Sequence, residues 1–258
     1  MKYPSITELV LRDGQQSLIA TRMRLSDITP ILSKLDNVGF SSLEMWGGAT
    51  YDCCLRFLNE DPWERLKVIK SNIKNTQLQM LLRGKNLVGY KKYDETVIDL
   101  FINKSSENGI DIFRIFDALN DINNIVYSIE CANKYNANSQ GTISYTTSPV
   151  HNEKYWLKLA KDIEDVGAKS LGIKDMAGLL KPKTAYNLIK KLKRNLNIPI
   201  HLHTHATTGL SDATNFKAYE AGVDNIDTSI SSFSNLYAHT ATESLISMIY
   251  DGNDNPFN

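Results

Sequence analysis

The stretch IPIHLHTHATTGLSDATNFKAYEAGVDNIDT, residues 198–228, contains one complete unit of the pattern on which this chain is built. Its apolar start and alternating side chains predict a strand over 198–205, because strand side chains point alternately to opposite faces. The amphipathic segment that follows predicts a helix over 211–221. Gly222 stands just past the end of that helix, where a residue in the left-handed backbone conformation commonly ends a helix. A second strand is predicted over 223–230.

The same unit recurs along the rest of the chain, and Gly39, Gly109 and Gly167 end three further helical segments in the same way. We expect strands over 7–13, 40–47, 77–84, 110–117, 141–147, 168–175, 198–205 and 223–230. We expect helices over 26–38, 62–74, 94–108, 120–135, 152–166, 182–194, 211–221 and 240–250. Eight strand–helix units in about 250 residues predict an α/β fold of the (β/α)8 or TIM-barrel type.

The alternative fold is a doubly wound sheet, but no glycine-rich phosphate loop follows the first strand. We expect residues 1–258 to form a single barrel domain, with 251–258 as a terminal loop. The 29 Lys and Arg residues balance the 29 Asp and Glu residues, which gives no support for a nucleic-acid or anionic-membrane surface. The three cysteines form no disulfide framework or zinc motif, so a reducing cytoplasm is expected.

Three of the five histidines lie in the 198–205 strand segment, at positions 201, 203 and 205. The two-residue period of a strand places His201, His203 and His205 on one face. One interpretation is a histidine-rich strand in a polar core. The second interpretation is a metal site. It is favoured by three histidines in register before a turn that ends in glycine, since imidazole is the commonest side-chain metal ligand.

Polar side chains also follow most of the other predicted strands, where the active sites of barrels lie. They form a ring of candidate functional residues: Arg12, Asp13, Glu44, Arg83, Arg114, Asp117, Lys174, Asp175, His203 and His205. Any one of them could be a solvated strand end or part of a buried ion pair. Together, around one mouth, they favour a catalytic site.

Asp13, His203 and His205 are the predicted metal ligands, and three protein ligands leave a position open for water or substrate. His201 shares the histidine face but should lie one layer deeper. Lys174 has two interpretations: an exposed base, or a lysine that has reacted with carbon dioxide to give an anionic carbamate ligand. Arg12, Arg83 and Arg114 can each clamp a carboxylate through two hydrogen bonds, while a metal polarises a nearby ketone.

At these residues the chain resembles the carboxyltransferase domain of biotin-dependent enzymes that act on pyruvate and oxaloacetate, over essentially its whole length. The matching segments are LRDGQQSLIATRMR from Leu11, LEMWGGATYD from Leu43, FLNEDPWERL from Phe57, LQMLLRGKNLVGY from Leu78, FRIFDALND from Phe113, GTISYTTSP from Gly141, GIKDMAGLL from Gly172, HLHTHATTG from His201 and AGVDNIDTSISS from Ala221. The segments HATTG and SNLYAHTAT, residues 234–242, are most similar to the oxaloacetate decarboxylase α subunit.

The resemblance implies roles for individual residues. Asp13, His203 and His205 match metal ligands, and Lys174 matches a lysine that is carbamylated and completes the coordination. The metal is zinc foremost, with cobalt or manganese as alternatives. Gln16 and Arg83 match residues that hold pyruvate. Three more match residues that line the pocket: Arg12, Arg114 and Met176. The residues expected to take part in catalysis are Lys174, Arg12, Gln16 and Arg83.

The implied activity is carboxyl transfer between oxaloacetate or pyruvate and biotin, as in an oxaloacetate decarboxylase. Family members carry biotin on a Met-Lys-Met segment, which this chain lacks, so biotin should arrive on another domain or subunit. The chain is expected to form a homo-oligomer in the cytoplasm. Any membrane association would come through partner decarboxylase subunits.

Some positions depart from the family pattern. Gly14-Gln15 stands where many members have Ala-His, and Tyr237 stands where pyruvate carboxylase has a proton-carrying threonine. Four other interpretations remain: a pyruvate carboxylase domain, a transcarboxylase domain, a Claisen-type lyase or synthase, and a non-catalytic assembly fragment. Related Claisen-type barrels have an asparagine at the position of Ala206, which weighs against that class.

Overall fold

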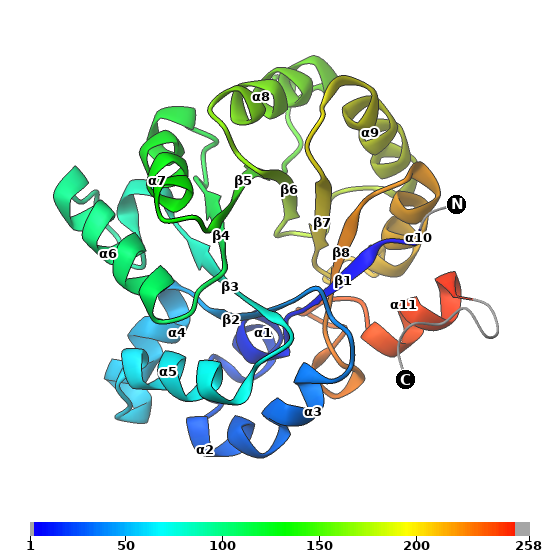
Figure 1. The fold of residues 1–258 in the computed structure, drawn as a ribbon. Helices are drawn as coiled ribbons and strands as arrows, with labels where there is room; N and C mark the ends of the chain where they lie inside the picture. The colour runs from blue at the N-terminus through cyan, green and yellow to red at the C-terminus, as the bar shows by residue number, and fades with distance from the viewer. Residues whose placement is uncertain (1–2, 251–258) are drawn as a thin grey trace.

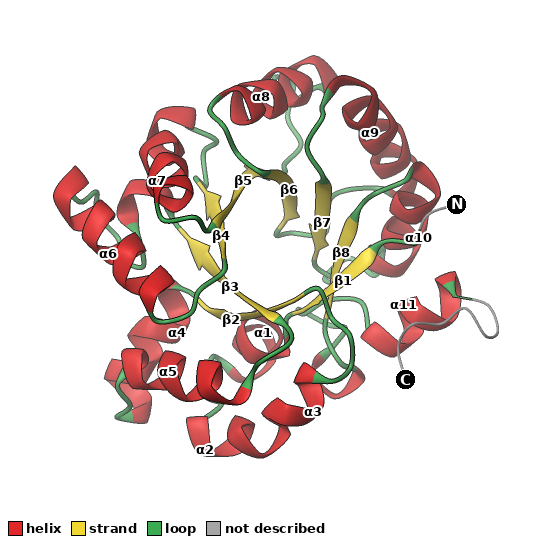
Figure 2. Ribbon diagram, in the orientation of Figure 1, coloured by secondary structure: helices red, strands yellow, loops and turns green. Residues whose placement is uncertain are grey.

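The computed structural model describes residues 3–250, and these form a closed barrel of eight parallel strands in sequence order (Figures 1 and 2). Strand β1 pairs with both β2 and β8, which closes the cylinder. The strands are β1 (Ser5–Glu8), β2 (Ser42–Trp46), β3 (Gln77–Leu82), β4 (Ile112–Phe116), β5 (Asn138–Ser144), β6 (Ser170–Asp175), β7 (Ile200–Thr204) and β8 (Asn225–Thr228). The predicted (β/α)8 barrel is therefore confirmed.

The helices surround the strands as an outer layer (Figure 2). The α-helices are α1 (Gln15–Ile19), α2 (Leu25–Ile28), α3 (Leu32–Asp36), α4 (Gly48–Cys53), α5 (Pro62–Asn72), α6 (Glu95–Glu107), α7 (Ile122–Lys134), α8 (Glu153–Asp165), α9 (Pro182–Asn195), α10 (Ser211–Ala221) and α11 (Thr242–Ile249). Within residues 3–250, no helix has the length and apolar character needed to cross a membrane.

The structure differs from the predicted boundaries mainly in the first third of the chain. Strand β1 ends at Glu8 rather than at 13, and Val10–Gly14 forms a π-helical turn that carries Arg12 and Asp13. The predicted helix over 26–38 is divided by a 3-10 turn at Thr29–Ile31, because Pro30 has no N–H for a helical hydrogen bond. Helices α1 and α4 were not predicted. The expected loop over 251–258 lies outside the described residues.

Side chains alternate along the strands between an apolar outer face and a polar inner face. Each strand buries at least one aliphatic side chain: Ile6, Leu43, Met80, Ile115, Ile143, Leu171, Leu202 and Ile226. Buried polar residues of the strands contact one another inside the barrel: Thr7, Glu44, Gln79, Arg114, Gln140, His201, His203 and Asp227. Barrel interiors are usually filled by branched aliphatic residues, so this charged interior needs a functional explanation.

Candidate active site

Four buried ligand-type side chains converge at the ends of three strands. Asp13 follows β1, His203 lies on β7, His205 follows β7, and His239 lies in the loop between β8 and α11. One ligand atom from each lies within 4.8 Å of the others. The structure therefore brings together the three predicted metal ligands and adds His239, which the sequence analysis did not identify as a ligand.

Each of the three histidines has its Nδ1 atom bound to a group that only accepts hydrogen bonds. The Nδ1 of His203 donates to Oδ2 of Asp227 at 2.6 Å, and that of His205 donates to the carbonyl of Tyr237 at 2.7 Å. The Nδ1 of His239 donates to the carbonyl of Thr204 at 3.0 Å. A neutral imidazole with its proton on Nδ1 has a free lone pair on Nε2.

All three Nε2 atoms face the same oxygen of Asp13. The distances to its Oδ2 are 3.3 Å from His203, 3.5 Å from His205 and 3.3 Å from His239. Burial lowers the pKa of His239 and holds that of His203 well below its usual range, so these two rings stay neutral. Three nitrogen lone pairs and one carboxylate oxygen are a donor set that suits a divalent metal such as zinc.

Asp13 itself is held in its charged form. Burial alone would raise the pKa of Asp13, but the positive charge of Arg12, the largest opposing cause, keeps this pKa well below its usual range. The Nη2 of Arg12 lies 2.8 Å from Oδ2 of Asp13. Within residues 3–250, Oδ2 of Asp13 has this ion pair but no hydrogen bond of regular geometry, and Nε2 of His239 has no hydrogen-bond partner. Buried polar atoms of this kind are rare unless an ion or ligand satisfies them.

Lys174 lies beside this cluster because it pairs in register with His203 on the neighbouring strand. Its Nζ is 2.8 Å from Nε2 of His203 and 3.8 Å from Oδ2 of Asp13. Burial lowers the pKa of Lys174 to about 8, against the opposing charge of Asp13. An amine with this pKa is partly neutral near pH 7, which is the form that reacts with carbon dioxide.

A cavity of about 340 Å³ opens directly above the cluster. Its lining includes seven residues that were predicted for the site at the mouth: Arg12, Asp13, Gln16, Arg83, Lys174, Met176 and His205. Arg114 is not among the lining residues, although the sequence analysis placed it in the pocket. A second cavity, of about 250 Å³, lies at the opposite end of the barrel and is lined by His201 and Gln140.

Arg83 is the cationic group of this pocket with the most freedom to bind a substrate. Its Nη1 donates to the carbonyls of Val88 and Gly89, and its guanidinium lies over the Tyr90 ring. Gly48 provides the space for it, because a Cβ at position 48 would lie 2.7 Å from Cζ of Arg83. No carboxylate of the described chain forms an ion pair with Arg83, so its planar donors remain available for an anion.

Arg114 instead lies inside the barrel, below the pocket. Its Nη1 is 3.0 Å from Oε2 of Glu44, its Nη2 donates to Asp227 at 3.1 Å, and its Nε donates to Gln140 at 2.6 Å. Burial alone would lower the pKa of Arg114, but the charges of Asp227 and Glu44 together raise it. These partners occupy its donors, so Arg114 balances buried carboxylates and does not reach the cavity.

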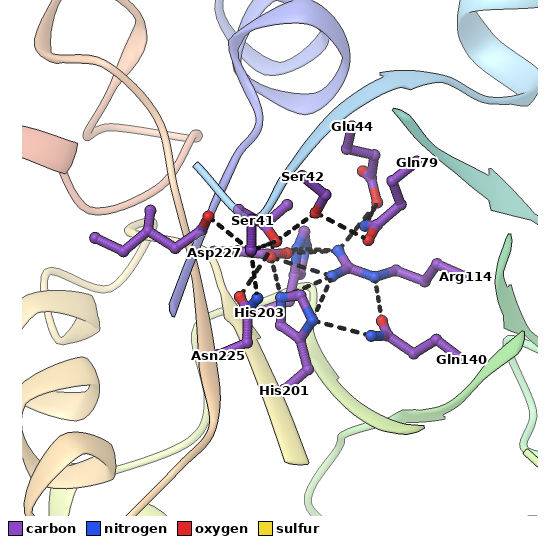
Figure 3. A network of polar contacts seen from close by, with 12 residues as sticks. Ser41, Ser42, Glu44, Gln79, Arg114, Gln140, His201, His203, Asn225 and Asp227 are labelled. Atoms are coloured by element: carbon purple, nitrogen blue, oxygen red, sulfur yellow. Dashed lines mark hydrogen bonds and ion pairs between the residues drawn. The ribbon is translucent and has the colours of Figure 1, made fainter. Parts of the chain in front are cut away.

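Figure 3 shows how this interior network reaches the histidines. Asp227 lies between His201 and His203 and accepts a hydrogen bond from each, while Arg114 binds the same carboxylate. His201 is one layer deeper than His203 and contacts Gln140 at 2.9 Å, away from Asp13. Glu44 joins this network to the mouth, because it also accepts from Nε of Arg12 at 2.7 Å.

Two functional positions were missed in the sequence analysis. His239 lies inside the segment 234–242, which was used only for its resemblance to a family. A histidine that follows the last predicted strand could itself have indicated a metal ligand at the mouth of the barrel. Asp227 lies in the predicted strand over 223–230, and the polar alternation of that strand indicates its inward face. Neither position could be assigned a partner before the barrel closed.

The chain belongs to the HMGL-like family, whose model matches residues 4–253. Within that family, the resemblance to biotin-dependent carboxyltransferase domains is confirmed. The chain is 53% identical over 241 residues to a pyruvate carboxylase subunit of Methanocaldococcus jannaschii, and the match covers 93% of this chain and 42% of that subunit. It is 51% identical to the methylmalonyl-CoA carboxyltransferase 5S subunit of Propionibacterium freudenreichii subsp. shermanii, where the match covers 95% of this chain and 49% of that subunit.

A solved structure of the carboxyl transferase domain from Rhizobium etli pyruvate carboxylase with pyruvate is similar throughout. Its TM-score is 0.96 at 40% identity, and the match covers 99% of this chain and 45% of that one. The chain thus spans less than half the length of these relatives.

Proposed function

We propose that this barrel transfers a carboxyl group between a 2-oxo acid, oxaloacetate or pyruvate, and biotin carried on another domain or subunit. The observation that carries the proposal is the convergence of Asp13 and three histidine Nε2 atoms beside a pocket that contains Arg83. The names of the similar proteins, pyruvate carboxylase and methylmalonyl-CoA carboxyltransferase, support the same chemistry.

The proposed ligands of the metal, zinc foremost, are Asp13, His203, His205 and carbamylated Lys174. In carbamylation, the neutral amine of Lys174 forms an N–C bond to carbon dioxide and loses one proton to solvent. The product is an anionic oxygen ligand in place of a cation. When bound, the metal would polarise the substrate ketone and stabilise the enolate.

The chain's own residues would bind and orient the substrate. Arg83 would pair its planar guanidinium with the substrate carboxylate, and Gln16 would hydrogen-bond to the substrate from α1. Met176 would provide an apolar wall. Arg12, held by Glu44, would keep Asp13 ionised and in place.

Within this class we propose oxaloacetate decarboxylation as the direction of the reaction. The C–C bond to the leaving carboxyl group breaks, and its electron pair remains as the enolate. The carboxyl carbon forms a bond to a ureido nitrogen of biotin, and the proton lost there ends on the enolate carbon to give pyruvate. The segments HATTG and SNLYAHTAT support this direction, as does Tyr237 in place of a threonine. Membrane subunits would then be partners.

The names of the similar proteins favour a second candidate, carboxylation of pyruvate by carboxybiotin, which is the same step in reverse. The test is oxaloacetate decarboxylation by the metal-loaded chain, with and without free biotin or a biotin carrier domain. Biotin-dependent pyruvate formation is expected. If turnover requires the metal but does not change when biotin is added, the proposal of carboxyl transfer is wrong. If turnover requires an acyl-CoA, the chain is a Claisen-type enzyme.

The same preparation tests the remaining assignments. Elemental analysis should give one divalent metal per chain, and its absence would favour a non-catalytic assembly role. Light scattering measures the proposed homo-oligomer directly.

A further inference from the structure

His239 lies in the loop between β8 and α11, and its position at the cluster is held from several sides. The residue is fully buried. Its backbone forms an antiparallel bridge with His205, and its carbonyl accepts from the N–H of Asn235 at 2.7 Å. Its Nδ1 is bound to the carbonyl of Thr204. The ring therefore cannot turn without breaking contacts to β7.

This arrangement directs the other nitrogen of His239 into the cluster. The ring centroid lies 4.5 Å from that of His203 and 4.3 Å from that of His205. Its Nε2 lies 3.3 Å from Oδ2 of Asp13 and has no hydrogen-bond partner within the described range 3–250, whereas that oxygen forms an ion pair with Arg12. With its proton on Nδ1, Nε2 of His239 is a buried acceptor without a donor, which is unfavourable unless a cation lies there.

Lys174 meets the cluster from the neighbouring strand. Its Nζ contacts His203 at 2.8 Å and is 3.8 Å from Oδ2 of Asp13. Asp13, His203, His205 and His239 are thus four protein donors that do not include the lysine. Four such donors are a complete set for zinc, which also accepts a fifth ligand.

We infer that His239 is a direct ligand of the metal and that it retains the metal when Lys174 carries no carbamate. This inference rests on the metal site of the proposed function. The carbamate then adds an oxygen ligand to a site that already binds, so carbamylation adjusts the affinity of the site without creating it.

The test compares the metal affinity of the wild-type chain with that of His239→Leu, Lys174→Met and the double variant. Each protein is stripped with a chelator and titrated with Zn²⁺ against a competing chelator, once in CO2-free buffer and once with bicarbonate. Co²⁺ absorption spectra report the number of ligands independently of activity. The control is His151→Gln, a histidine in the loop before α8 that bonds to Ser148.

In CO2-free buffer, the wild type, Lys174→Met and His151→Gln should each bind one metal per chain. His239→Leu should bind at least tenfold more weakly there and should recover part of its affinity when bicarbonate is added. The double variant should not recover. His239→Ala is the second variant, and metal-free melting temperatures show that each protein folds.

The outcomes separate this inference from the proposed function. If His239→Leu and His239→Ala both bind as tightly as the wild type in CO2-free buffer, His239 is not a ligand. If the wild type binds only with bicarbonate, metal retention without the carbamate is refuted. If the wild type binds under neither condition, the metal site of the proposed function itself is wrong.

Discussion

The Oδ2 atom of Asp227 accepts a 2.6 Å hydrogen bond from Nδ1 of His203, and both residues are fully buried. The contact sets the tautomer of His203, because a carboxylate at Nδ1 leaves the lone pair on Nε2 facing Asp13. Carboxylates that hold a ligating histidine in this way are common behind metal sites. Asp227 is itself held by Arg114 and His201, so a network through the barrel interior positions this proposed ligand.

We expect Asp227→Asn to weaken metal binding by roughly 10- to 100-fold. The amide can donate to Nδ1 of His203, which would move the ring proton to Nε2 and block the lone pair. Chelator competition measures the affinity. Asp224→Asn is the matched control, since Asp224 bonds to Lys193 and the backbone at the other end of the strand. Equal affinities in the two variants would contradict the positioning role.

Arg83→Lys should lower kcat/KM for the 2-oxo acid by at least about tenfold, because lysine keeps the charge but loses the planar pair of donors. Metal content should remain at the wild-type level, since Arg83 lies outside the ligand cluster. Steady-state kinetics with oxaloacetate check this prediction. An unchanged kcat/KM would show that Arg83 does not bind the substrate carboxylate.

Gly48→Ala tests the same site without removing any functional group. The new Cβ would lie 2.7 Å from Cζ of Arg83, so the guanidinium must move, while a flexible side-chain end can move at little cost to stability. KM should therefore rise while the melting temperature stays close to that of the wild type. Gly47→Ala is the control, because its Cβ would meet nothing closer than 3.4 Å. A similar KM in both variants would show that Arg83 does not bind substrate.

Incorporation of carbon dioxide at Lys174 should rise steeply between about pH 7 and pH 9. Burial lowers the pKa of Lys174 to about 8, so the neutral amine becomes the main form across this interval. Carbon-13 NMR of the metal-free chain in labelled bicarbonate should show one carbamate signal, which Lys174→Met removes. A signal that persists in that variant would assign the modification elsewhere.

Glu8 should make the protein less stable as pH rises from about 4.5 to about 7. Burial raises the pKa of Glu8 to about 7, against hydrogen bonds from Thr242, Ile230 and Val10. In that interval the folded state holds a proton that the unfolded state has released, so the free energy of unfolding falls with pH. The shift from 4.5 to about 7 corresponds to about 3 kcal/mol.

Glu8→Gln imitates the protonated form and is the variant that checks this prediction. Urea unfolding should show similar stability for the two proteins near pH 4.5 and a more stable variant near pH 8. Glu130→Gln is the control, since Glu130 is an exposed carboxylate on α7 and has no influence on Glu8. If the difference between wild type and Glu8→Gln does not change with pH, Glu8 is ionised throughout.

The sequence alone determined the elements, the fold class and part of the site. Helical periodicity and the glycines at 39, 109, 167 and 222 are local signals, so they indicate where each helix ends. The two-residue period of β7 placed His201 and His203 on one face. The break at Pro30 had a local signal in the proline itself, whereas the turn at Val10–Gly14 was harder to predict, because strand pairing decides where β1 ends.

Only the tertiary structure decided which residues meet. Asp13 and His239 are far apart in sequence and come within 3.3 Å because the barrel closes between β1 and β8. Arg114 has the chemistry of a substrate clamp, but two buried carboxylates on other strands neutralise it inside the barrel. Local sequence encodes the face to which a side chain points, whereas its charge partners come from strands that only closure brings together.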